Sequence, residues 1–179
     1  MSGSTRKRQD AANDPKADGG RPGVDREKPG FIPLPPLIYA VGIILSLVLH
    51  AFYPLPWFGS PMLDILAAVG WLALLATAAL FFTALRALRR ARTPVNPNAR
   101  PEHLVTAGPF GLSRNPLYLA NTLLLIGLGL ASGITWFLPL ALICAYLIQK
   151  LSIEREERWL IEKFGKRYRD YAKRVRRWI

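Results

Sequence analysis

The sequence is short of the residues that build disulfide frameworks and metal sites. Among its 179 residues there is one cysteine, Cys144, and there are only two histidines. A single cysteine excludes a disulfide framework. The sequence shows no metal-ligand cluster, no serine–histidine–acid set and no glycine-rich phosphate loop. We therefore predict no metal site.

Positive charge is missing from two long stretches of the chain. All 24 Lys and Arg fall in three blocks, with 7 in residues 1–30, 6 in residues 86–114 and 11 in residues 150–179. The stretches between these blocks are apolar, and 51% of the chain is hydrophobic. A soluble protein with a net charge of +12 would suggest nucleic-acid binding. This partition instead points to a membrane protein, so we expect no nucleic-acid partner.

Four apolar stretches predict transmembrane helices. A helix needs about 20 apolar residues to cross ~30 Å of hydrocarbon, and residues 34–53 and 62–85 meet that length. Residues 117–130 and 134–148 are shorter, and only "ASG" separates them, which predicts a tight helical hairpin. The expected fold is an all-α integral membrane protein with about four transmembrane helices, a C-terminal helical hairpin and a cytoplasmic amphipathic tail helix.

The charge blocks also predict orientation and organisation. The short connections at residues 54–61 and 131–133 contain no Lys or Arg. The positive-inside rule therefore puts both termini and the 86–114 loop in the cytoplasm. We predict three parts: a disordered basic cytoplasmic tail (1–30), the N-terminal transmembrane helices (31–93), and a functional region with the hairpin and the cytoplasmic tail (94–179).

The predicted hairpin brings distant polar residues to one membrane face. Tyr118 starts the third apolar stretch, and the sequence "EREERWL" follows the fourth, so both lie on the cytoplasmic side. Acidic side chains are not ordinary anchors at a membrane surface, because anionic headgroups repel them. The patch gathers His103, Arg114, Asn115, Tyr118, Glu154, Glu156 and Glu157.

Two interpretations of this patch stay open. Its glutamates could simply form helix pairs, such as Glu154 with Arg158 at i, i+4 spacing. Alternatively, carboxylates and an amide could bind hydroxyl or ammonium groups, while Phe110 and Tyr118 attract a cation. S-adenosylmethionine carries all of these groups, although a dinucleotide would use several of the same contacts.

Two stretches resemble a known family. The sequence "LVTAGPFGLSRNPLYLA", followed by "EREERWLIEKFGKRYRDYAKRVRR", resembles the isoprenylcysteine carboxyl methyltransferase and phospholipid methyltransferase group of integral membrane enzymes. The resemblance covers about residues 94–179. It is carried by the order of "RNPLY", Glu-Glu-X-X-Leu, Phe-Gly-X-X-Tyr-X-X-Tyr and Arg-Val-X-Arg. It implies a multi-pass, prokaryotic-type member in a bacterial cell membrane, with S-adenosyl-L-methionine as cofactor.

The resemblance also implies site residues. Histidine in the family corresponds to Asn115 here, which keeps hydrogen bonding but cannot titrate. In the eukaryotic isoprenylcysteine enzymes an arginine before the Glu pair meets the substrate carboxylate, and Ser152 takes its position here. The candidate catalytic residues are therefore Arg114, Lys150 and Arg155. The implied cofactor contacts are Glu102, His103, Leu104, Val105, Phe110, Asn115, Pro116, Leu117, Tyr118, Glu156 and Glu157.

The resemblance implies methyl transfer to a lipophilic or small acceptor. Carboxyl methylation of isoprenylcysteine is one form, and a phospholipid amine or a thiol is an alternative acceptor. A membrane reductase of the sterol-reductase type and a non-catalytic membrane scaffold are the other hypotheses. The basic stretch "FGKRYRDYAKRVRRW" predicts an amphipathic helix on membrane lipids, with a cover over the cofactor as a second interpretation.

Overall fold

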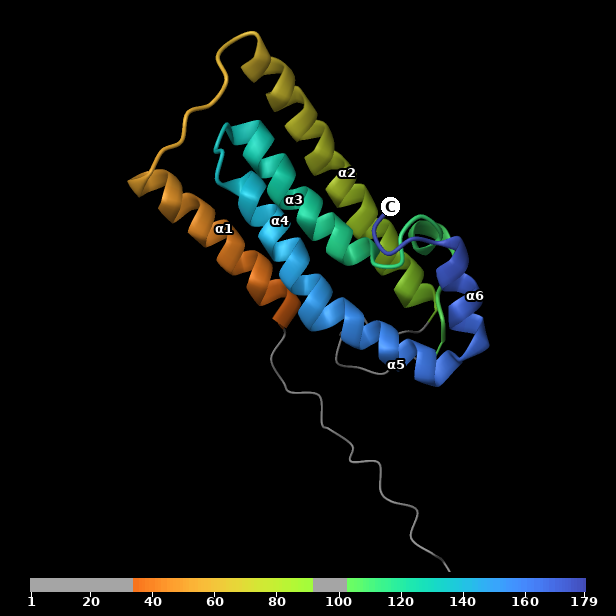
Figure 1. Cartoon of the computed structure of the whole chain (residues 1–179). Coiled ribbons are helices and arrows are strands. Elements are labelled where there is room, and N and C mark those ends of the chain that lie inside the picture. The colour runs from red at the N-terminus through yellow and green to blue at the C-terminus, as the bar shows by residue number, and fades with distance from the viewer. Residues whose placement is uncertain (1–33, 92–102) are drawn as a thin grey trace, which may run out of the picture. The chain divides into compact units, whose positions relative to one another are not determined.

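The computed structural model describes residues 34–91 and 103–179, which contain helices and no strand. The predicted 1–30 tail and Glu102 lie outside these described residues. Figure 1 shows the helices in chain order. They are α1 (Leu34–Phe52), α2 (Met62–Arg90), the short 3-10 helix η1 (Gly108–Gly111), α3 (Pro116–Ser132), α4 (Phe137–Ile148), the π-helical segment η2 (Gln149–Ile153), α5 (Glu154–Phe164) and α6 (Lys166–Arg174).

The apolar helices lie in the order α1, α4, α3, α2. Among them, α3 packs most extensively against α2, and α4 packs against both α3 and α1 (Figure 1). Three helical stretches of the described residues are long and apolar enough to cross a membrane: Pro35–Phe52, Met62–Arg90 and Phe137–Phe164. The apolar α3 has 17 residues, which corresponds to a length of about 25 Å. The prediction of an all-α membrane protein is confirmed, with three helical stretches that could span a membrane and a shorter apolar helix.

Two helices extend beyond their predicted ends. α2 runs to Arg90 and not only to residue 85, because arginine is a good helix former and its charge suits the C-terminal end of a helix. α4 continues through η2 into α5, so one helical stretch spans Phe137–Phe164. The predicted turn after α3 is confirmed. Gly133 ends that helix at φ 73, a left-handed conformation that glycine adopts without strain.

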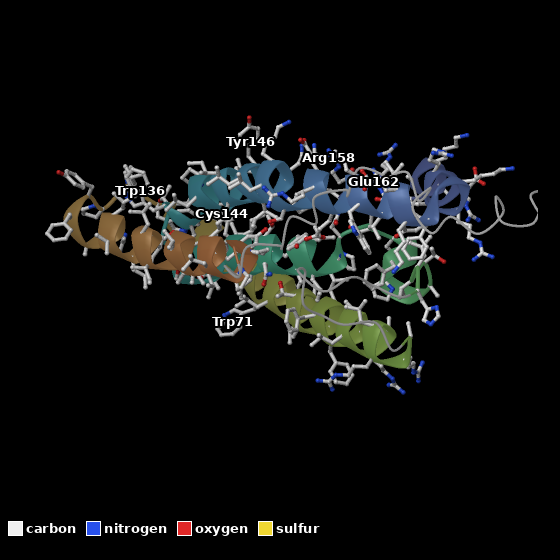
Figure 2. The ribbon with its side chains drawn as sticks, turned by 90° about the horizontal axis from the view of Figure 1, so that it is seen from below. Trp71, Trp136, Cys144, Tyr146, Arg158 and Glu162 are labelled. Carbon is white, nitrogen blue, oxygen red and sulfur yellow. The ribbon has the colours of Figure 1, made fainter. Side chains whose placement is uncertain are left out.

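The outer surface of the helices is strongly apolar. Trp71 on α2 and Tyr146 on α4 are 63% and 62% exposed, and Figure 2 shows both pointing away from the helices. Cys144, two residues before Tyr146, lies between the helices, and its thiol donates to the Ile38 carbonyl oxygen at 3.6 Å. In a bilayer the exposed apolar side chains contact lipid. Helices are stable there because all of their backbone hydrogen bonds are made within the helix.

Glycines let α2 and α3 approach to backbone contact. A Cβ atom on Gly70 would lie 2.4 Å from the backbone nitrogen of Ala131 and 2.9 Å from the carbonyl oxygen of Gly127. A Cβ atom on Gly127 would lie 3.0 Å from the side chain of Leu74. The α2–α3 contact therefore depends on the absence of side chains at these two positions, as in other close helix pairs of membrane proteins.

Replacing Gly70 by Ala should destabilise the protein. The added methyl group collides with the α3 backbone, and overpacking of this kind lowers the free energy of unfolding by about 1–3 kcal/mol. The measurement is the melting temperature of the detergent-purified protein. Gly59→Ala is the matched control, because no atom lies within 4 Å of a Cβ at that position. Equal melting temperatures for the two variants would contradict the proposed contact.

Candidate functional site at the helix ends

The central contact of the site joins the start of α3 to α5. Asn115 precedes α3, and Pro116 takes the first helical position, where its missing N–H is no loss. Tyr118 is 9% exposed and donates its hydroxyl to Glu156 Oε1 at 2.5 Å. Glu156 Oε2 has no hydrogen-bond partner within residues 34–91 and 103–179. The hairpin thus brings Tyr118 and the acidic stretch together, although Tyr118 and Glu156 are 38 residues apart.

A buried network from α1 supports Tyr118. The Tyr39 hydroxyl lies 2.8 Å from Thr122 Oγ1 and donates to the Tyr118 carbonyl oxygen at 3.2 Å. The Thr122 hydroxyl donates to the same carbonyl at 3.0 Å. The hydroxyls of Tyr39 and Thr122 therefore both have partners, as buried polar groups require. Sequence reasoning missed Tyr39, because nothing in the apolar stretch around it marks a contact with α3.

Glu157 binds two arginines. Arg114 Nη1 lies 3.0 Å from Glu157 Oε1. Arg177 approaches with two nitrogens, Nε at 3.1 Å from Oε1 and Nη2 at 2.7 Å from Oε2. The Glu157 side chain is 12% exposed, and its hydrogen bond raises the pKa of Arg177. Both oxygens of Glu157 are therefore occupied, whereas Glu156 keeps one oxygen without a partner among the described residues.

Residues 175–179 lie along the loop that precedes α3. The Ser113 hydroxyl and the Asn115 Nδ2 both donate to the Arg177 carbonyl oxygen, at 3.2 and 3.1 Å. With its Nδ2 held in this way, Asn115 presents Oδ1 without a partner in the described part of the chain. Arg177 was missed as a site residue. The signal for it was its place in the closing Arg-Val-X-Arg motif.

A polar pocket of ≈ 500 Å³ lies between the loop that begins at His103 and α6. Its lining includes His103, Leu104, Asp170, Tyr171 and Arg174. The Tyr171 hydroxyl donates to the Phe110 carbonyl oxygen at 2.6 Å, which fixes the loop against α6. Burial raises the pKa of Tyr171, with Arg114 opposing the rise, so the hydroxyl stays a neutral donor at pH 7.

The structure divides the predicted cofactor contacts into two adjoining groups. One group lies at the helix ends and comprises Asn115, Pro116, Leu117, Tyr118, Glu156 and Glu157. The other lies on the loop before α3 and comprises His103, Leu104, Val105 and Phe110. Arg114 connects the groups, because it lies on the loop just before Asn115 and its side chain pairs with Glu157 at 3.0 Å.

Arg114 is the one predicted catalytic residue that lies among these contacts. Lys150 instead forms an exposed ion pair with Glu154 at 2.8 Å, and the Arg155 side chain is exposed. Glu154 therefore does form a helix pair, but with Lys150 and not with Arg158. Lys150, one turn earlier on the helical stretch, takes that role. Figure 2 shows Arg158 on α5, where its side chain is exposed.

An apolar groove of ≈ 1130 Å³ runs along α2 beside the same loop. Small or apolar side chains line most of it, including Ala76, Ala79, Ala87, Val105, Ala107 and Leu112. Arg86 and Arg90 supply its cationic part. Leu104 and Thr106 line both the groove and the polar pocket, so the two spaces adjoin.

Comparison with known proteins defines the class. The fold is that of an all-helical membrane protein with a polar site at its helix ends. Residues 65–167 match the family described as phospholipid methyltransferase, and the chain belongs to that family. The chain is also 37% identical over 65 residues to an uncharacterized protein of Haemophilus influenzae, a match that covers all of that protein and 35% of this chain. The family consists of membrane methyltransferases, so methyl transfer is the class of activity it indicates.

Replacing Glu157 by Gln should destabilise the protein, because Arg114 and Arg177 would face each other without a counter-charge. Since the side chains of Glu157, Arg114 and Arg177 are mostly but not fully buried, the free energy of unfolding should fall by about 1–3 kcal/mol. Chemical denaturation in detergent measures this. Glu154→Gln is the control, because its ion pair with Lys150 is exposed, and it should leave the denaturation midpoint unchanged. A similar midpoint for both variants would show that the two-arginine contact is unimportant.

Proposed function

We propose that the protein transfers the methyl group of S-adenosylmethionine to an acceptor that reaches the site through the membrane. The observation that carries this proposal is the Glu156 carboxylate. Tyr118 fixes one of its oxygens, while the other has no partner in the described residues. A preset acceptor of this kind suits a ligand with hydroxyl or ammonium hydrogens. Membership of a methyltransferase family supports the reaction class.

The residues present fit this cofactor. Glu156 and Asn115 would accept hydrogen bonds from ribose hydroxyls or from an amino group, and Phe110 and Tyr118 would offer aromatic faces to a cation. Arg114 Nε is buried without a hydrogen-bond partner in the described chain and would donate to a carboxylate. The adjoining pocket of ≈ 500 Å³ is within the size range of small-molecule sites, roughly 300–1,000 Å³. Bound S-adenosylmethionine would supply an electrophilic methyl group on a sulfonium.

The chain's own residues would act by alignment. Displacement at a methyl carbon requires the nucleophile and the leaving sulfur in line, and a rigid site favours that geometry. Tyr39 and Thr122 would keep Tyr118 in place. A carboxylate or thiolate acceptor needs no base, whereas an amine acceptor must lose a proton. Asn115 cannot accept that proton, and Glu156 has a carboxylate oxygen that can.

The groove along α2 supports an amphiphilic acceptor. Its apolar walls would hold a hydrocarbon chain, and Arg86 and Arg90 would attract an anionic group near the headgroup. Because the groove meets the polar pocket at Leu104 and Thr106, the headgroup would lie close to the cofactor. A phospholipid amine and an isoprenylcysteine carboxylate both satisfy these conditions. A small thiol would leave the groove without a role.

We further propose that the site faces the cytoplasm. Arg86, Arg89 and Arg90 end α2 close to the site, and α6 is rich in exposed Lys and Arg. The connections at the opposite ends of the helices, residues 53–61 and 133–136, contain no Lys or Arg. A water-soluble cofactor would then enter from the cytoplasm and the acceptor from the bilayer. Lys150 and Arg155 stay predicted contacts of an acceptor carboxylate.

The first test is calorimetric binding of S-adenosylmethionine to the detergent-purified full-length protein. We expect Glu156→Gln to weaken binding about 10- to 100-fold, because it replaces one of the two acceptor oxygens by an amide NH2 group that cannot accept a hydrogen bond. Tyr118→Phe should weaken it less, since it removes only the group that orients Glu156. Glu154→Gln, on the exposed side of the helix, is the matched control and should bind like the unaltered protein.

The acceptor is tested by transfer of a labelled methyl group to phosphatidylethanolamine vesicles and to a prenylated cysteine. Labelled lipid or prenylcysteine supports the proposal. The absence of both cofactor binding and transfer in folded protein would overturn it. Binding of a reduced nicotinamide in place of S-adenosylmethionine would favour a membrane reductase instead.

Filling the groove should raise the KM for a lipid acceptor. Ala79→Phe adds a ring to the groove wall, and we expect at least a severalfold higher KM with unchanged affinity for S-adenosylmethionine. Leu72→Phe is the control on the same helix, because residue 72 is 65% exposed on the lipid-facing side. An unchanged KM in Ala79→Phe would mean that the acceptor does not enter by this groove.

A further inference from the structure

Arg177 contacts both the start of α3 and the helix α5, through different groups. Its guanidinium binds both oxygens of Glu157, at 3.1 and 2.7 Å. Its backbone carbonyl oxygen accepts from Asn115 Nδ2 at 3.1 Å and from the Ser113 hydroxyl at 3.2 Å. One residue therefore joins the start of α3 to α5 independently of the Tyr118–Glu156 contact.

The residues on either side of Arg177 hold it in this position. The Arg114 N–H donates to the Arg176 carbonyl oxygen at 3.0 Å. Trp178 Nε1 donates to Gln149 Oε1 at 2.9 Å, and the indole packs against the buried core. Val175 leaves α6 in an extended conformation, with φ −118 and ψ 127. Residues 175–179 thus contact the loop before α3, the π-helical segment η2 and α5.

These contacts decide which polar atoms face a ligand. The bond to the Arg177 carbonyl uses the donor side of the Asn115 amide, so Oδ1 is the side left to accept. The bidentate bond to Arg177, together with Arg114, uses both oxygens of Glu157. Glu156 consequently becomes the acid with an oxygen available, and it lies next to Glu157 in the sequence.

We propose that Arg177 is a positioning residue and that residues 175–179 form a latch that sets the binding geometry of the site. Arg177 does not contact the ligand in this proposal. It orients Asn115 and fixes Glu157, so that Asn115 Oδ1 and Glu156 Oε2 accept hydrogen bonds from the bound methyl donor. The identity of that ligand rests on the proposed function. The positioning itself does not, because it concerns contacts made without a ligand.

Arg176 provides a matched control. It is adjacent to Arg177 and carries the same charge, but its side chain is exposed and has no partner among the described residues. Its contribution to the latch is a backbone carbonyl, which a side-chain substitution preserves. A general effect of positive charge on membrane binding would appear equally in Arg176→Ala and Arg177→Ala. A positioning effect appears only in the second.

The ligand-based experiment measures the Kd of S-adenosylmethionine in the detergent-purified full-length protein. We expect Arg177→Ala to raise the Kd about tenfold or more, Arg177→Lys to restore part of the affinity because it keeps the charge without the two-nitrogen contact, and Arg176→Ala to stay within about twofold of the unaltered protein. The melting temperature of each variant is recorded without ligand. A folded Arg177→Ala protein with unchanged Kd overturns the proposal.

A second variant covers failure of Arg177→Ala to fold. Trp178→Phe keeps an aromatic ring but removes the N–H that donates to Gln149. If the latch sets the site, this variant raises the Kd while Arg176→Ala does not. If Trp178→Phe binds as tightly as the unaltered protein, the latch has no role in binding.

A ligand-free experiment separates the latch from the proposed function. Hydrogen exchange is measured at the backbone amide of Arg114, which donates to the Arg176 carbonyl. We expect faster exchange there in Arg177→Ala or Trp178→Phe, and unchanged exchange in Arg176→Ala. Failure of the unaltered protein to bind S-adenosylmethionine would overturn the proposed function alone. Unchanged exchange in all variants would overturn the latch.

Discussion

The carboxylate of Glu157 is the contact on which the site depends. It lies between Arg114, on the loop just before α3, and Arg177, which follows α6. A carboxylate removed from water is costly unless charged donors surround it, and here two guanidiniums do so. The same pairing holds three segments that are distant in sequence. The neighbouring Glu156 can then keep an oxygen available, because Glu157 already holds the helices together.

Much of the fold could be predicted because it follows from the partition of apolar and charged residues. The hairpin turn was predictable because a short glycine-containing connection separates two apolar runs, and Gly133 does adopt the left-handed conformation there. The α2–α3 contact could not be predicted in the same way. It depends on which faces of two helices meet, and Gly70 and Gly127 indicate close packing without naming the partner.

The site could be predicted in part. The hairpin geometry and the family resemblance together brought Tyr118 and Glu156 to one place, since both mark helix ends. The resemblance gave Glu156 and Glu157 as neighbouring cofactor contacts. It did not indicate that Glu157 binds Arg114 and Arg177, because those contacts depend on the three-dimensional packing of segments that are apart in the sequence. The role of Tyr39 could not be predicted either, because a tyrosine in an apolar helix gives no indication of its hydrogen-bond partner. The apolar groove along α2 arises only when that helix and the loop before α3 are placed together.

The π-helical segment η2 constrains the number of residues that the chain can have between Cys144 and Glu156. In an α-helix each residue turns the chain by about 100°, so the number of residues between Cys144 and Glu156 sets the direction in which Glu156 points. Cys144 faces the core and Glu156 faces Tyr118, with the π-helical turn between them adjusting the phase. One residue inserted or deleted here would rotate the acids out of the site while leaving every side chain of the motif unchanged. Spacing in this stretch therefore carries as much structural information as residue identity.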